Sequence, residues 1–206
     1  MNEPAPPPAA RASNSCLRCG LLLGLVTGVC LGSALFLRAR SEDPGYVRGV
    51  LTELLDAEVP AGYKPGRAFP LPLRNQQFVT LVREGIDTRE AGPGDLGFVI
   101  NVNAIPQGLT PEAFMEKLEG WLAADTARKL KITTRQPIRF AVRGAEVEGV
   151  ELSGVLETTN APLRMVWVPL LQHPADPEAG WVLVSCMGTP ERFDEVAMRS
   201  FLASVK

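Results

Sequence analysis

The longest uninterrupted apolar stretch of the chain lies close to its N-terminus. Residues 19–37, CGLLLGLVTGVCLGSALFL, are 19 positions without a charged side chain. A helix of that length reaches about 28 Å at ~1.5 Å per residue, which matches the ~30 Å hydrocarbon core of a bilayer. The pattern therefore predicts a single transmembrane helix over residues 19–40, ahead of the folded part of the chain.

Two alternatives to an uncleaved anchor stay open. Gly32 and Ala34 are small residues at which a secretory signal peptide could be cleaved. Lipoprotein processing at Cys30 is the weaker alternative, because the bulky Val29 precedes the cysteine. The length of the run and the Arg-Ala-Arg sequence at 38–40 favour the uncleaved anchor. Arginines are near parity in the two flanks, so the positive-inside rule leaves the orientation undecided.

Glycines recur every fourth position in the predicted anchor. These are Gly20, Gly24, Gly28 and Gly32. Residues four apart share one helix face, and glycine there allows a second helix to approach closely. Glycine is also common in membrane helices generally, but three overlapping GxxxG motifs favour a helix-packing role. We therefore expect a homo-oligomer or a partner transmembrane helix to contact this face.

After the anchor, the apolar positions first follow a helical period. One stripe is formed by Tyr46, Val47, Val50, Leu51, Leu54 and Leu55, and Pro60 marks its limit. This juxtamembrane helix could lie on the bilayer surface. Because no lysines are interleaved with the stripe, packing against its own domain is the favoured interpretation.

Strand patterns follow. Residues 59–73 contain four prolines, which predicts an extended segment along a sheet edge. Residues 76–84 alternate, with Phe78, Thr80 and Val82 on one side, and residues 96–104 place Phe98, Ile100 and Val102 on one face and Asn101 and Asn103 on the other. A loop over residues 85–95 is expected to join these two strands.

The sequence Thr110-Pro111-Glu112 predicts a helix start. A hydroxyl can cap the helix, proline suits its first turn, and an acid favours the positive end of the helix dipole. The expected apolar stripe consists of Phe114, Met115, Leu118, Trp121 and Leu122. A second such start, Thr189-Pro190-Glu191, predicts the last helix, whose inward residues are expected to be Phe193, Val196, Ala197 and Phe201.

Between these two helices lie four strand candidates. They are residues 138–142, 146–157, 163–171 and 181–187, and the apolar phase of the second shifts at Gly149, which predicts a bulge there. Turns expected at Gly144, at Asn160 and over residues 174–180 favour antiparallel order. The whole pattern predicts a disordered Pro/Ala-rich tail (1–18), the anchor (19–40) and one α+β domain (44–206), a mostly antiparallel sheet flanked by helices as an α/β/α sandwich.

This order of elements resembles the PsbP/DcrB-type superfamily of α/β/α sandwiches. The resembling pieces are residues 98–103, 110–122, 143–152, 163–171 and 181–205. The resemblance implies a small, non-enzymatic accessory protein that is extracytoplasmic or tethered to a membrane. It supplies no catalytic residue to carry over.

Net charge and cysteine content limit the kinds of partner and ligand that we expect. The formal net charge of -2 gives no long-range attraction for nucleic acid, so a nucleic-acid partner is not expected. Of four cysteines, Cys16, Cys19 and Cys30 lie in or beside the anchor, which leaves Cys186 alone in the domain. One cysteine closes no internal disulfide, and the Cys16/Cys19 pair lacks the further ligands that zinc requires.

Candidate chemistry is sparse. His173, the only histidine, is expected in a loop exposed to solvent, and Cys186 is expected as a buried thiol. Asp176 and Glu178 could help to hold a cation near His173, but their spacing matches no calcium loop.

Two further groups of residues have an anion-binding or phosphate-binding alternative. Arg139, Arg143 and Arg164 could line one sheet face and receive an anion, although solubilising charges are the favoured interpretation. The Gly92-Pro93-Gly94 sequence is typical of a turn and not of a phosphate loop.

These observations lead to a functional hypothesis without an assigned catalytic, metal or cofactor site. We expect a single-pass, membrane-anchored, non-enzymatic accessory or binding domain on the extracytoplasmic side, which assembles through the glycine face of its anchor. The alternative is a tethered or secreted enzyme with an active-site cleft that the sequence does not reveal.

Overall fold

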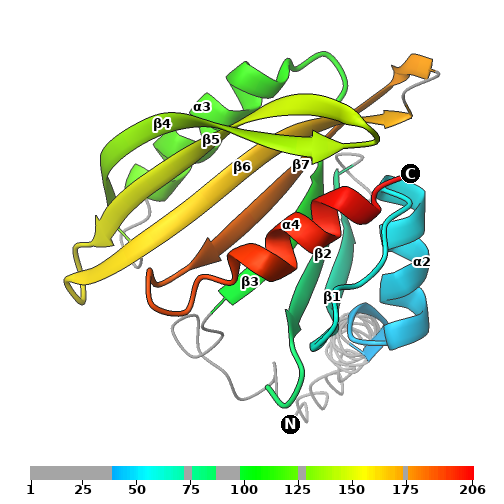
Figure 1. The fold of residues 1–206 in the computed structure, drawn as a ribbon, viewed down its shortest axis with the longest axis horizontal. Helices are drawn as coiled ribbons and strands as arrows, with labels where there is room; N and C mark the ends of the chain where they lie inside the picture. Colours follow the sequence, from blue (N-terminus) through cyan, green and yellow to red (C-terminus); the bar gives the residue numbers. More distant parts are fainter. Residues whose placement is uncertain (1–38, 72–75, 87–97, 125–128, 174–175) are drawn as a thin grey trace, which may run out of the picture. The chain divides into compact units, whose positions relative to one another are not determined.

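The structure, a computed structural model, describes residues 39–71, 76–86, 98–124, 129–173 and 176–206. Ser41–Lys206 form one compact unit. Among the described residues, seven antiparallel strands form one sheet in the order β1-β2-β3-β7-β6-β5-β4 (Figure 1). The strands are β1 (Tyr63–Leu71), β2 (Gln76–Arg83), β3 (Phe98–Ala104), β4 (Leu130–Val142), β5 (Ala145–Leu156), β6 (Ala161–His173) and β7 (Asp176–Gly188), and the helices are α2 (Pro44–Leu54), α3 (Pro111–Ala124) and α4 (Glu195–Ser204). The expected α+β class with a mostly antiparallel sheet is confirmed.

The first helix packs on its own domain. Val47, Val50, Leu51 and Leu54 of α2 are buried, as the apolar stripe predicts. The helix begins at the N-cap Asp43, whose side chain accepts a hydrogen bond from the Tyr46 amide. It ends at Leu54, earlier than Pro60 alone would require, because Leu55 adopts an extended conformation.

The first three strands follow the predicted pattern. β1 is an edge strand that pairs only with β2, which agrees with its prolines. In β3, Ile100 and Val102 are fully buried on one face. On the other face, the Thr80 hydroxyl donates to Asn101 and the Asn103 amide donates to the Leu183 carbonyl.

The last four strands form successive hairpins, but two of their boundaries differ from expectation. β4 begins at Leu130, eight residues before the expected 138. The sequence does not indicate this first half, because it is an exposed edge with little apolar alternation. The expected turn over residues 174–180 is shorter, since β6 continues to His173 and β7 begins at Asp176, and these two residues pair. His173 therefore ends a strand and does not lie in a long loop.

The bulge expected at Gly149 is absent from β5, where Gly149 pairs in register with Ile138. The register shift lies instead in β4, between Ile132 and Thr134. One extra residue there turns the following side chains to the opposite face. β5 places apolar side chains on both faces of the sheet and needs no bulge. Val147 packs on the face of α2 and α4, whereas Leu152 packs on the face of α3.

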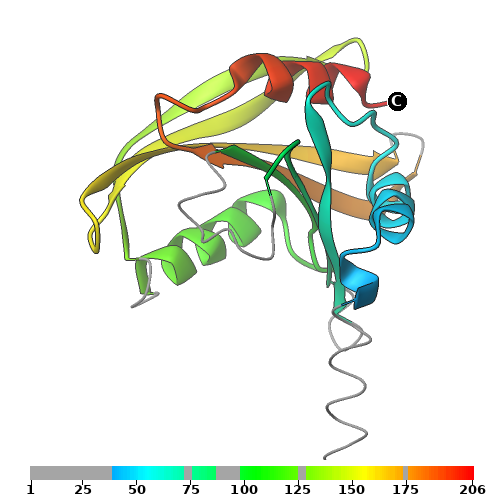
Figure 2. The ribbon, with the colours of Figure 1, turned by 90° about the horizontal axis from the view of Figure 1, so that it is seen from below.

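Helices lie on both faces of the sheet, and Figure 2 shows α4 and α3 on opposite sides. One hydrophobic cluster joins α2 and α4 to the sheet, and it includes Leu51, Leu54, Met198 and Phe201. A second cluster joins α3 to the other face and contains fewer fully buried residues. The face that α3 covers is therefore the less completely enclosed one.

Two expected core residues point outward. Val196 is 80% exposed, because α4 begins at Glu195 and its buried stripe runs through Met198 and Leu202. The Thr189-Pro190-Glu191 sequence forms only a turn, in which the Arg192 amide donates to the Thr189 carbonyl. Trp121 is 59% exposed at the edge of the α3 stripe, where only Pro111 and Met115 are buried.

The predicted N-terminal segments lie outside the described residues. This applies to the tail (1–18), the anchor up to residue 38, and the glycine face of Gly20, Gly24, Gly28 and Gly32. Among the helices that the structure describes, none combines the length and the apolar character needed to cross a bilayer.

Candidate functional site

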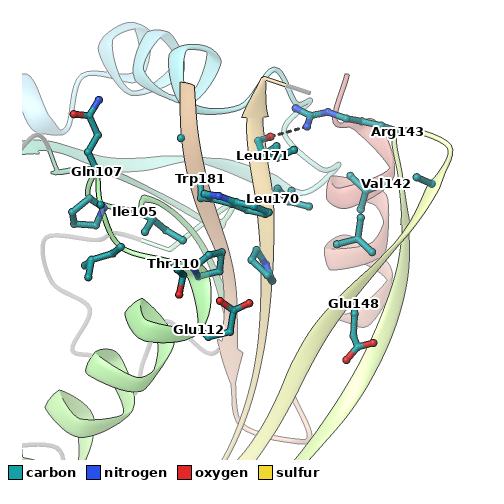
Figure 3. Close-up of a pocket in the computed structure, with 18 of the residues that line it drawn as sticks. Ile105, Gln107, Thr110, Glu112, Val142, Arg143, Glu148, Leu170, Leu171 and Trp181 are labelled. Atoms are coloured by element: carbon teal, nitrogen blue, oxygen red, sulfur yellow. Dashed lines mark hydrogen bonds between the residues drawn. The ribbon is translucent and has the colours of Figure 1, made fainter. Parts of the chain in front are cut away.

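An open groove of about 1250 Å³ lies on the face of the sheet that carries α3. Three parts of the chain line it: residues 105–112 from the β3–α3 connection, Val142, Arg143 and residues 145–148 from the β4–β5 hairpin, and residues 169–171 with Gly180 and Trp181 from β6 and β7. Residues 105–112 form the first wall and the β4–β5 hairpin forms the second, and Figure 3 shows Trp181 between them. The groove is therefore built from segments that are distant in sequence.

Hydrogen bonds and a glycine turn hold the first wall, residues 105–112, in place. The Ile105 amide donates to the Trp181 carbonyl over 2.8 Å, which ties the β3–α3 connection to β7. Gly108 turns the chain with a φ of 81°. The Ala113 amide then donates to the Thr110 hydroxyl over 3.3 Å, so the predicted cap of α3 is confirmed.

The second wall, the β4–β5 hairpin, is held in place by Arg143. Arg143 and Gly144 both adopt positive φ, 53° and 73°, in the turn between β4 and β5. The Arg143 guanidinium donates to the carbonyl oxygens of Leu171, Gln172 and Lys206 over 2.7, 3.2 and 2.7 Å, and Figure 3 shows the bond to Leu171. Burial lowers its pKa, although an arginine remains a cation. This side chain joins the hairpin to the end of β6 and to the C-terminus.

The groove combines apolar surface with an acidic rim. Its lining includes the buried Ile105, Val142 and Leu170 and the half-buried Leu109, Leu171 and Trp181. Three exposed carboxylates, Glu112, Glu146 and Glu148, stand among these residues. Glu146 pairs with Arg139 over 2.9 Å, whereas Glu112 and Glu148 have no ion-pair partner among the described residues. Figure 3 places Glu112 and Glu148 on opposite walls.

The sequence pattern does not predict this site. It indicates only a helix start at Glu112 and the first residue of a strand at Trp181. A signal did exist in β5, because Glu146 and Glu148 continue the face that carries Val150 and Leu152. Acids replace apolar residues on that face where the groove opens.

The three arginines weighed as an anion site are not brought together. Arg143 lies at the end of β6, beside Leu171, whereas Arg164 lies near its start. Arg164 forms a two-point ion pair with Glu151 over 2.8 and 3.2 Å and stacks over the Phe193 ring at 4.4 Å. Each arginine already has an anionic or carbonyl partner, so this anion hypothesis is wrong.

The side chains of His173, Asp176 and Glu178 lie outside the part of the chain that the structure describes, so the cation hypothesis stays a prediction. Cys186 is buried and free, as expected, and burial raises the pKa of its thiol, which opposes a nucleophilic role. Among the residues that the structure describes, no group of three or more His, Cys, Asp or Glu side chains could hold a metal ion. Gly92-Pro93-Gly94, Cys16, Cys19 and Cys30 lie outside the described residues.

A second polar cluster, centred on Asp194, joins β1 and β2 to α4. Asp194 accepts hydrogen bonds from the Tyr63 hydroxyl and Arg83, each over 3.0 Å, and from the Ala197 amide over 2.9 Å. Burial would raise the pKa of Asp194, but these hydrogen bonds outweigh it and hold the pKa below its ordinary value. Burial also raises the pKa of Tyr63 to about 12. The cluster has the character of a structural clamp, because every member is already paired within it.

Comparison with known proteins adds no relative. The chain matches no protein-family model and no curated protein. The site's geometry therefore has to carry the functional argument.

Proposed function

We propose that the protein is a single-pass, membrane-anchored accessory domain that faces the extracytoplasmic side and binds a partner in the groove without catalysing a reaction. The groove is the observation that carries this proposal. It offers apolar surface from the half-buried Leu109, Leu171 and Trp181 beside the start of α3. Apolar surface within a groove is typical of interaction sites.

The character of the lining supports binding more than catalysis. Cys186, the free cysteine of the described residues, does not line the groove. Its carboxylates are exposed at the rim, whereas catalytic acids are usually placed in enclosed sites that perturb them. The fixed walls, held by the Ile105 amide and the Arg143 guanidinium, suit a preformed recognition surface.

The sequence supports the location. The uncharged run at residues 19–37 has the length of a membrane helix, and its glycine face can pack against another helix. The layering of helices about the sheet agrees with the α/β/α sandwich that the resemblance to the PsbP/DcrB-type superfamily implies. That resemblance implies an accessory protein that is extracytoplasmic or tethered to a membrane, and we assign this domain to the extracytoplasmic side.

Site-specific photocrosslinking tests the proposal. A photoreactive amino acid at the exposed Gln107, on the groove wall, is expected to give a discrete adduct when the full-length chain is irradiated in its native membranes. The matched control is the exposed Arg192, which precedes α4 and does not line the groove. The same adducts from both positions, or none from Gln107, would contradict a groove that binds a partner.

A further inference from the structure

The geometry points to a specific chemistry for the groove's occupant: a segment of a partner polypeptide that carries a lysine or arginine next to large apolar side chains. This inference rests on the proposed function and names the class of partner. It follows from the charge balance, the apolar surface and the size of the groove.

The charge balance at the groove favours a cation. The one cation among the described lining residues, Arg143, is held by three backbone carbonyls at the far end of the hairpin. Glu146 is offset by Arg139. Glu112 and Glu148 remain exposed on opposite walls, without an ion-pair partner among the described residues (Figure 3). A ligand lying between these walls therefore meets a net acidic lining, in which Arg139 lies opposite Glu148 in the β4–β5 pairing and Glu112 stands in the first turn of α3.

The surface between these acids favours an apolar neighbour for that cation. Leu109, Leu171 and Trp181 are half-buried there, so an occupant would remove further apolar area from water. The Trp181 indole also offers an aromatic surface, to which ammonium and guanidinium groups are attracted. A purely polar cation would leave this apolar area uncovered.

The dimensions favour a chain segment over a small molecule. Small-molecule sites usually measure ~300–1,000 Å³ and enclose most of their ligand. This groove measures about 1250 Å³, and its walls carry exposed residues such as Gln107, Gly108 and Ala145. An anionic membrane surface is disfavoured, because the carboxylates of Glu112, Glu146 and Glu148 in the lining would repel its headgroups.

Peptide binding to the full-length chain in detergent tests the inference. The probes are a short fluorescent peptide of alternating leucine and lysine and its charge-reversed counterpart of leucine and glutamate, measured by fluorescence anisotropy. The leucine-lysine peptide is expected to bind more tightly, and the difference is expected to shrink at high salt. The Glu112→Gln/Glu148→Gln variant is expected to weaken its binding by about tenfold.

A matched variant removes two acids elsewhere. Glu84 and Glu116 are exposed and do not line the groove, so Glu84→Gln/Glu116→Gln is expected to change affinity by about twofold or less. All four substitutions are isosteric and at exposed positions, and circular dichroism of each variant is the check of its folding. Equal effects of the two double variants, or no binding of the leucine-lysine peptide, would overturn the inference.

A third variant separates this inference from the proposed function. Leu109→Gln replaces apolar surface on the groove wall without changing charge. If it weakens binding of the leucine-glutamate peptide while the rim variant has no effect, the groove binds a partner but the assignment of a cation is wrong. If peptide binding depends on neither Leu109 nor the rim, both proposals fail. Tighter binding to phosphatidylglycerol vesicles that Leu109→Gln abolishes would replace the polypeptide with a lipid surface.

Discussion

At Gly149 the backbone of β5 passes so close to its neighbour that a side chain has no room. A Cβ atom at this position would lie 2.7 Å from the Trp167 carbonyl oxygen and 3.1 Å from a methyl carbon of Val168. Backbone cannot move aside as a flexible side chain can. The glycine is therefore required by close packing and not by the bulge that its sequence context suggested.

Replacing this residue is expected to destabilise the domain. Gly149→Ala forces β5 away from β6, and overpacking of this kind costs about 1–3 kcal/mol of unfolding free energy. Urea denaturation followed by circular dichroism measures the change. The control is Gly120→Ala in α3, where nothing lies within 4 Å of the added Cβ. Alanine there should stabilise the helix by up to about 1 kcal/mol, and a similar loss at both sites would refute the packing argument.

Among the elements, α4 depends on contacts far from it in sequence. Asp194 caps the helix through the Ala197 amide and also binds Tyr63 and Arg83, which lie on β1 and β2. At the other end, the Ser204 hydroxyl accepts a hydrogen bond from the Glu58 amide over 2.9 Å. The helix start is therefore set by the Asp194 cluster, which explains why the Thr-Pro-Glu sequence before it forms only a turn.

The Asp194 cluster predicts a dependence of stability on pH. Because the folded state lowers the pKa of Asp194 below its ordinary value of 3.8, its charged form stabilises the fold fully above about pH 4. That contribution is lost as the pH falls through the folded-state pKa. Asp194→Asn keeps the cap but loses the partly exposed ion pair with Arg83, so it should cost about 0.5–1 kcal/mol at pH 7.

Urea denaturation at a series of pH values checks this expectation. The difference between the native chain and Asp194→Asn should shrink as the pH falls below about 4. Glu191→Gln removes a charge from the same exposed turn without touching the cluster, and its curve should run parallel to that of the native chain. A difference for Asp194→Asn that stays constant with pH would show that the ion pair contributes nothing.

Hydrophobic alternation predicted most strand interiors but not all boundaries. Ile138, Phe140 and Val142 alternate as expected because one face of that half of β4 packs under α4. The other half, from Leu130, is exposed on most positions, so it carries no clear period. The groove was not predictable from local patterns, because the β3–α3 connection comes beside Trp181 through the pairing of β3 with β7, which are distant in sequence.

At the scale of the whole chain, we propose two contact surfaces, the groove of the folded unit and the glycine face of the predicted anchor. The groove belongs to the unit Ser41–Lys206, whereas the glycine face belongs to residues 19–37. Contacts between membrane helices can hold copies or partners together while the groove stays free for a ligand. The two surfaces can therefore be tested independently.

The last prediction concerns helix association through the glycine face of the predicted anchor. In Gly24→Leu/Gly28→Leu, two large side chains block close helix approach, which should weaken association in the membrane by about 1–2 kcal/mol. Chemical crosslinking of the full-length chain in alkali-extracted membranes measures this loss. The control, Leu22→Val/Val26→Leu, changes the opposite helix face and should leave crosslinking intact, as should Glu112→Gln in the groove. Unchanged crosslinking in the glycine variant would exclude helix packing, and recovery of a soluble chain that begins beyond Ala34 would exclude the anchor itself.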